Sequence, residues 1–357
     1  MKQFKFPMPA RYGINMTLLA ALLAGGYFLL ESGILPRAHS NNIILVGIFI
    51  ILAVSLNLVT GYLGQLPLGH AGFMAVGAYV GAIFWRSGFL PDAVSVPGGI
   101  LLAGLVAAVF GIIIGIPALR LRGDYLAIIT LGFGEMIRVL VTNIDGTARW
   151  FVTSINELFG MQIPVPTVIT GGAPGLSSPR HSSFLVVYIC VIFACGAIHM
   201  LMKSRHGRAI LSIRENEIAA ESCGINTTYY KVMAFAVSAF FAGVAGALFA
   251  GNTGFLVPDS FDFMTSINIL MIVVLGGMGS MAGSVVAAAI LTSLPVLMQG
   301  LAQWRMVIYA LLLIIVMIFK PTGLLGTYDF SLSRILEKIV RRFRAGKTPK
   351  GGADIGE

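Results

Sequence analysis

Residues 204–231 read SRHGRAILSIRENEIAAESCGINTTYYK and form a polar centre in an otherwise apolar chain. This segment is far too polar to cross a membrane, yet apolar runs long enough to span a bilayer flank it on both sides. Apolar residues at helical spacing predict one short amphipathic helix in its middle, and Gly224 is a typical helix stop. Such a helix either lies on the lipid surface or docks into a soluble partner.

The composition is that of a membrane protein. Of the 357 residues, 57% are hydrophobic and 11% are charged, whereas soluble domains are about 25% charged. Many apolar runs of roughly 17–20 residues predict an all-α polytopic protein instead of a β-barrel. The net charge of +9 lies in loops and in the tail, as membrane orientation requires, and does not indicate nucleic-acid binding. The three cysteines show no metal-ligand spacing, so no metal site is expected.

The apolar runs predict about eight to ten transmembrane helices. Two glycine-rich interruptions, residues 61–72 and 276–283, are either loops or re-entrant breaks, which leaves the number open. The expected spans are residues 14–30, 42–60, 73–85, 97–117, 125–141, 184–202, 232–251, 264–275, 284–298 and 304–319, with the longest loop at 142–183. The expected parts of the chain are 1–41 (tail and first span), 42–326 (transmembrane domain, with the polar loop at 203–231) and 327–357 (basic tail).

Lys and Arg are distributed unevenly between the two sides of these spans. With ten spans and the N-terminus inside, 18 of the 24 basic residues fall in inside segments. The other six lie in or near outside segments. By the positive-inside rule, this distribution places the polar segment and both termini in the cytoplasm.

The chain shows no energy source of its own. Gly346-Lys347-Thr348 resembles part of a phosphate-binding loop, but Arg341 stands at the position of its first glycine and no strand precedes it. No Ser/His/Asp, Cys/His or paired-carboxylate arrangement stands out, so we predict no catalytic residues and no enzyme.

Three stretches together resemble the permease subunits of ABC importers for branched-chain amino acids, specifically the M-type member of the permease pair. They are GYLGQ and LGHAG within 61–72, LRGDYLAIITLGF at 121–133, and the polar segment from Gly207 through RENEIAA at 214–220 to Gly224. The resemblance covers about residues 42–326. The three stretches together are specific for this family, although any one of them alone is not. Pro67 departs from it, since the family more often has Ser there, and the first forty residues are idiosyncratic.

The resemblance implies a multi-pass protein of the bacterial inner membrane that works with other proteins. These are a homologous second permease forming a heterodimer, two cytoplasmic ATPases that bind ATP-Mg, and an extracytoplasmic substrate-binding protein; this chain would bind no cofactor. The polar segment then resembles a coupling helix that docks into an ATPase. Its expected contact residues are Arg208, Arg214, Glu215, Asn216, Glu217, Ala219, Ala220 and Gly224. The residues themselves favour a protein partner, because the stretch Arg214-Glu215-Asn216-Glu217 is rich in acids where lipid-surface helices favour Lys and Arg.

Candidates for the substrate path lie at the glycine-rich interruptions, where broken helices expose backbone groups at membrane depth. Glu135 lies in an expected span with Arg138 one turn later, as either a functional group or half of a structural salt bridge near the outer interface. His70 is more often hydrogen-bonded structure than a ligand, and the glycines are either substrate contacts or packing sites. The full set is Asn57, Gly61, Gln65, Gly69, His70, Thr130, Glu135, Asn268, Gly276, Gly277 and Gly279.

Three other functions are weighed against this one. Permeases for urea and short amides look similar, and specificity largely belongs to the binding protein, so they remain the alternative. A secondary transporter would need ion-coupling acids inside the bilayer, where Glu135 is the plausible one. A polytopic membrane enzyme would need a cluster of polar residues at one membrane depth, which the sequence does not show.

Overall fold

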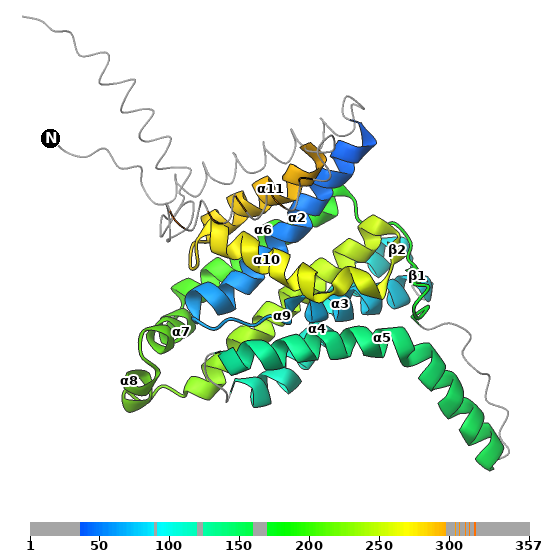
Figure 1. The fold of residues 1–357 in the computed structure, drawn as a ribbon, viewed down its shortest axis with the longest axis horizontal. Helices are drawn as coiled ribbons and strands as arrows, with labels where there is room; N and C mark the ends of the chain where they lie inside the picture. The colour runs from blue at the N-terminus through cyan, green and yellow to red at the C-terminus, as the bar shows by residue number, and fades with distance from the viewer. Residues whose placement is uncertain are drawn as a thin grey trace, which may run out of the picture. The chain divides into compact units, whose positions relative to one another are not determined.

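A computed structural model of the chain describes residues 36–88, 91–119, 124–159 and 170–297, together with positions 304, 307, 311, 314 and 318. The expected first span, most of the last one and the basic tail lie outside the described residues. The described part is built from helices (Figure 1). Two short strands, β1 (Leu176–Ser177) and β2 (Phe255–Leu256), pair in antiparallel fashion.

The helices follow the apolar runs of the sequence, because a chain in lipid satisfies its backbone hydrogen bonds within each helix. The elements are α2 (Arg37–Asn57), the π-helical turn η1 (Leu58–Tyr62), α3 (His70–Arg86), α4 (Asp92–Ala118), α5 (Asp124–Phe159), α6 (Phe184–Lys203), α7 (Arg205–Glu215), α8 (Glu217–Ser222), α9 (Thr227–Thr253), the 3₁₀ turn η2 (Pro258–Phe261), α10 (Phe263–Gly276) and α11 (Met281–Leu297).

Six of the described helices are long and apolar enough to cross a membrane. They are α2 with η1, α4, α5, α6, α9, and η2 with α10. α3 and α11 are shorter, at 17 residues each, and each begins within the last residues of one of the two glycine-rich segments. The prediction of an all-α polytopic membrane protein with glycine-broken segments is therefore confirmed.

Helix α9 forms the centre of the described bundle and packs along α2, α3 and α4. Its contact with α3 combines an aromatic pair, Phe73 with Phe235, and a close approach of the two backbones. A Cβ atom added to Gly246 would collide with the carbonyl oxygen of Met74, and one added to Gly77 would collide with Gly243. Small residues at such crossings let two helices approach closely where lipid provides no hydrophobic driving force.

Helix α5 is longer than the sequence suggested. It continues to Phe159, whereas a span ending at residue 141 and a loop from 142 were expected. The polar residues beyond 141 are accommodated in the helix, where their side chains bond to carbonyls one turn back: Thr142 to Arg138 (2.8 Å) and Asn143 to Val139 (2.9 Å). No proline occurs between 118 and 163 to end the helix.

The close contact of α3 and α9 predicts a clear stability effect. We expect Gly246→Ala to lower the free energy of unfolding by about 1–3 kcal/mol, because the added methyl group overpacks the crossing. Gly196→Ala on α6 is the matched control, since an added Cβ there meets nothing within 4 Å. Thermal unfolding of the purified protein in detergent compares the two, and an unchanged Gly246→Ala variant would contradict the tight crossing.

Candidate functional site

The polar segment folds into two short helices, α7 and α8, where one was expected. Between them Asn216 has an extended backbone, with φ −160° and ψ 110°. Its side-chain oxygen accepts a hydrogen bond from the N–H of Ala219 (3.1 Å), which makes Asn216 the N-cap of α8. The preference of asparagine for the N-cap position therefore outweighs the helix propensity of the residues around it. Gly224 follows α8 with a positive φ of 81°, as expected for a helix stop.

Helix α8 is tied to the first turns of α9. The ammonium group of Lys231, whose side chain is 5% exposed, donates to Glu217 Oε1 (2.5 Å). The hydroxyl of Thr227 donates to Glu221 Oε1 (2.7 Å). α9 begins at Thr227, five residues before the expected span, because the side chain of Asn226 caps it. These bonds fix the position of α8 on the central helix.

The outer face of the two loop helices is defined by Glu215, Ile218 and Ala219, all of which are exposed. Ile218 is 66% exposed, which is unusual for a large apolar residue on a polar loop. Ile213 and Ala220 instead face the bundle and are buried. Of the other expected contact residues, Arg208, Arg214, Asn216 and Gly224 are exposed and Glu217 is half-buried.

The two glycine-rich segments meet at one place, and Asn57 joins them. The Asn57 amide is fully buried; its nitrogen donates to the Ser280 carbonyl (3.1 Å) and the Ser284 hydroxyl (3.0 Å). Its oxygen accepts from the N–H of Gly279 (2.8 Å). A Cβ on Gly61 would collide with both Asn57 and Gly279, so a close backbone approach requires glycine there.

The turn between α10 and α11 is equally tight. An added Cβ at Gly276 would lie 2.6 Å from the carbonyl carbon of Gly283, so the end of α10 touches the start of α11. Gly277 and Gly279 both have positive φ, 108° and 89°. The glycines of this turn therefore allow a sharp reversal that other residues would strain.

Helix α3 begins inside the bundle, at His70. The His70 ring is buried, with Nε2 3.0 Å from the hydroxyl of Ser55. The N–H of Ala71 donates to the hydroxyl of Ser266 on α10 (3.1 Å). Just before α3, a Cβ on Gly69 would collide with the carbonyl oxygen of Thr130. In this structure His70 is thus a hydrogen-bonded packing residue at a helix start.

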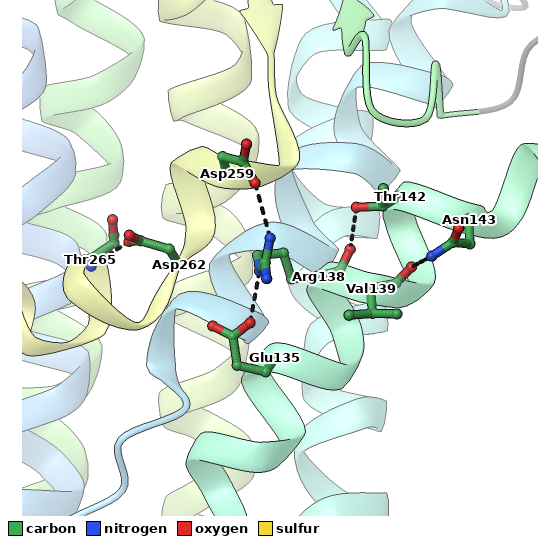
Figure 2. A network of polar contacts seen from close by, with 8 residues as sticks. All are labelled: Glu135, Arg138, Val139, Thr142, Asn143, Asp259, Asp262 and Thr265. Carbon is green, nitrogen blue, oxygen red and sulfur yellow. Dashed lines mark hydrogen bonds and ion pairs between the residues drawn. The ribbon is translucent and has the colours of Figure 1, made fainter.

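Figure 2 shows an ionic network between α5 and η2. Arg138 donates through Nε to Glu135 Oε2 (2.8 Å) and through Nη1 to Asp259 Oδ1 (2.9 Å). Next to it, Asp262 accepts a hydrogen bond from the N–H of Thr265 (2.8 Å) and caps α10. The Glu135–Arg138 pair follows from the sequence spacing, but Asp259 lies 121 positions away and was not predicted to join it.

A shallow hollow, partly open to the surroundings, lies beside this network, and in this conformation it has no room for a water molecule. It brings together the start of α3, the middle of α5 and the start of α10. Its polar side chains are two carboxylic acids, Glu135 and Asp262, and the hydroxyl of Ser266. Its apolar walls are Leu68, Leu131, Phe261 and Phe263. The hollow therefore combines negative charge with an apolar surface.

The remaining path candidates are dispersed. Thr130 is buried and bonds to carbonyls of its own helix as well as to the N–H of Leu68 (3.0 Å). Gln65 is half-buried, and its Oε1 has no hydrogen-bond partner among the described residues. Asn268 is exposed on α10. Sequence reasoning missed Ser266, Ser280 and Ser284, because single serines in apolar runs give no signal until the fold shows their partners.

Helices α5 and α6 are similarly exposed. About one residue in five is buried in each: 17% of the central stretch of α5 and 22% of that of α6. The exposed positions of α6 include Leu185, Ile189 and Phe193 together with His199. Those of α5 include Ile128, Val139 and Leu140 together with Asn143. Both helices therefore present mostly apolar surfaces, and α5 differs by the half-buried ion pair of Glu135 and Arg138.

Comparison with known proteins places most of the chain in one family. Residues 39–319 match the family described as "Branched-chain amino acid transport system / permease component". No solved structure matches the chain.

Curated relatives agree with this match. The chain is 41% identical over 292 residues to the high-affinity branched-chain amino acid transport system permease protein LivM of Salmonella typhimurium, covering 78% of this chain and 68% of that protein. It is 37% identical over 342 residues to LivM of Escherichia coli, covering 90% and 78%. It is 26% identical over 297 residues to the permease protein LivH of Salmonella typhimurium, covering 80% and 94%. By these matches, the chain belongs to the family of branched-chain amino acid transport system permease components.

Proposed function

We propose that this chain is the membrane-spanning subunit of an ATP-driven importer that moves branched-chain amino acids into a bacterial cell. The likeness to LivM over most of the chain is the observation that carries the proposal. The chain pairs with a homologous second permease, and the likeness to LivH supports a partner of related sequence. An extracytoplasmic binding protein delivers the amino acid, and two cytoplasmic ATPases bind ATP-Mg and supply the energy.

In the proposed complex, this chain provides the substrate path and the surface on which the ATPases dock. Its residues perform no covalent chemistry. Closure of the ATPases moves the loop helices α7 and α8, and the spans alternate between outward-facing and inward-facing states. The exposed Ile218 between acidic residues suits an apolar groove with a polar rim.

The proposed orientation places both termini and the loop helices in the cytoplasm. The excess of Lys and Arg on that side supports it. The contact of Arg214 with Gly61 also supports it, because the loop helices and the first glycine-rich segment then share one end of the bundle, as the charge distribution requires. The Arg138–Asp259 pair belongs to the opposite, extracytoplasmic half.

The exposed side of α5 is the proposed contact with the second permease and the boundary of the substrate path. Polar groups on a transmembrane helix normally face protein or a water-filled path. The hollow beside Glu135 is lined on this side by Leu131, Gly134 and Glu135. It is too small for an amino acid in this conformation, so we propose that it widens during transport. Its carboxylates then suit the ammonium group of an amino acid, and its Leu and Phe walls suit a branched side chain.

Replacing Ile218 tests the docking surface. We expect Ile218→Arg to reduce co-purification of the ATPases and ATP-dependent leucine uptake by about tenfold or more, because a charge replaces a buried apolar anchor. The fold should be unaffected, since this side chain is 66% exposed. Thr228→Arg, at an exposed position on the first turn of α9, is the charge-matched control. Normal assembly and uptake by Ile218→Arg would refute the docking assignment.

A pair of substitutions separates the two roles of Glu135. Glu135→Gln and Asp259→Asn each remove one carboxylate from Arg138, but only Glu135 lines the hollow. We expect Glu135→Gln to raise the KM of leucine uptake about tenfold, because a hydrogen bond to a charged group contributes about 1.5–3 kcal/mol. Asp259→Asn should change the KM much less. Equal effects of the two variants would show that Glu135 serves the ion pair alone.

Uptake assays with the complete importer also test the cargo. We expect leucine, isoleucine and valine to be taken up and to compete with one another, while urea and acetamide neither enter nor compete. In the complete importer the binding protein largely selects the cargo, and the carboxylates of the hollow add a preference for an ammonium group over a neutral amide. Transport of urea at a comparable rate would overturn the proposed substrate class.

A further inference from the structure

Three segments that are far apart in the sequence meet at the side chain of Arg214. Its Nη1 donates to the carbonyl oxygen of Gly61 (2.7 Å). A Cβ added at Gly279 would lie 3.3 Å from the same nitrogen, and one added at Gly64 would lie 3.0 Å from Arg214 Cγ. The arginine of the last turn of α7 therefore lies across both glycine-rich segments at once.

A long, positively charged side chain such as Arg214 suits the contact with the Gly61 carbonyl. Gly61 lies in η1, at the C-terminal end of the helix that starts with α2, where the last carbonyls have no partner within the helix. A helix C-terminus also carries partial negative charge, which favours a positive side chain. Arg214 supplies a charged hydrogen bond to one of these carbonyls from a different part of the chain.

The contact continues into the bundle through Asn57. Asn57 lies one turn before Gly61 and holds Gly279, Ser280 and Ser284 with its amide group. A displacement of Gly61 therefore acts on the turn between α10 and α11 as well as on the end of α2. Such hydrogen bonds are directional, so a shift of one bonded segment moves the other segment with it.

The loop helices have two different attachments. α8 is held to α9 by Lys231–Glu217 and Thr227–Glu221, and α9 is the central helix of the described bundle. α7 also packs on α9, where the ring of His206 lies beside that of Tyr230, and its Arg214 hydrogen-bonds to the first glycine-rich segment. Arg205, at the start of α7, is exposed, and its side chain makes no hydrogen bond or ion pair with any described residue.

We propose that Arg214 is the positioning residue through which movement of α7 reaches both glycine-rich segments. When the loop helices move, the arginine pulls Gly61, and through Asn57 it shifts the α10–α11 turn in the same step. The inference rests on the proposed function, because it assumes that ATPases move the loop helices. Its consequence is that Arg214 sets how much transport each ATP supports and has no part in holding the ATPases.

The test uses the complete importer, with both permeases, the ATPases and the binding protein, in proteoliposomes. Arg214→Met keeps a long side chain and removes the charged donor; Arg205→Met is the matched control. We expect Arg214→Met to retain bound ATPases and ATP hydrolysis while leucine uptake per ATP falls about tenfold, as loss of a charged hydrogen bond predicts. Arg205→Met should match the wild type.

Hydrogen exchange supplies a measurement that a merely structural role would not change. In the wild type, a non-hydrolysable ATP analogue should alter amide exchange in residues 217–222, 58–64 and 277–281. In Arg214→Met, the change should persist in 217–222 and disappear in the other two segments. Persistence in all three segments would overturn the proposal.

Several outcomes contradict the proposal in distinguishable ways. Wild-type uptake per ATP in Arg214→Met would show that the contact carries no movement, and loss of bound ATPases would show that Arg214 belongs to the docking surface. If Arg214→Met does not assemble, Arg214→Gln decides, because it removes the charge and shortens the side chain: reduced uptake per ATP supports the proposal and wild-type uptake refutes it. A wild-type importer without ATP-dependent uptake would instead refute the proposed function.

Discussion

Backbone groups freed by the two glycine-rich segments must find partners inside the protein, because lipid offers none. The other polar contacts in the bundle follow from this constraint. Asn57 satisfies the backbone at Gly279 and Ser280, and Ser266 accepts from the start of α3. Arg214 does the same for Gly61 from outside the bundle. Each break in a helix therefore leaves backbone groups whose hydrogen bonds join segments that are distant in the sequence.

This requirement explains why the polar loop is more than a connection between two spans. A solvated loop helix would need no bond to the bundle, yet α7 and α8 are joined to it at Gly61, Thr227 and Lys231. The buried ammonium group of Lys231 would be costly without the Glu217 carboxylate. The apolar Ile218 is left exposed while Ile213 and Ala220 turn inward. A loop built in this way presents a defined surface at a fixed place.

The sequence predicts what depends on local chemistry. Apolar runs located the helices, the glycines marked both breaks, and the spacing of Glu135 and Arg138 made an ion pair one of the two alternatives for Glu135. It could not predict contacts that only the fold creates, such as Arg138 with Asp259 or Asn57 with Gly279. It also misjudged competing local preferences. Polar residues after 141 bond back to their own helix and extend α5, and Asn216 caps a helix where it was expected to continue one.

The same need for partners applies to the ion pair on α5. Most exposed positions of α5 are apolar, but the side chains of Glu135 and Arg138 are about one-third exposed. Arg138 uses two of its donors on Glu135 and Asp259, and lipid would not satisfy the others. Polar groups at such a place on a transmembrane helix normally face protein or a water-filled path. Under the proposed pairing with a second permease, this ion pair would be covered, and the hollow at Glu135 would lie where two subunits enclose the path.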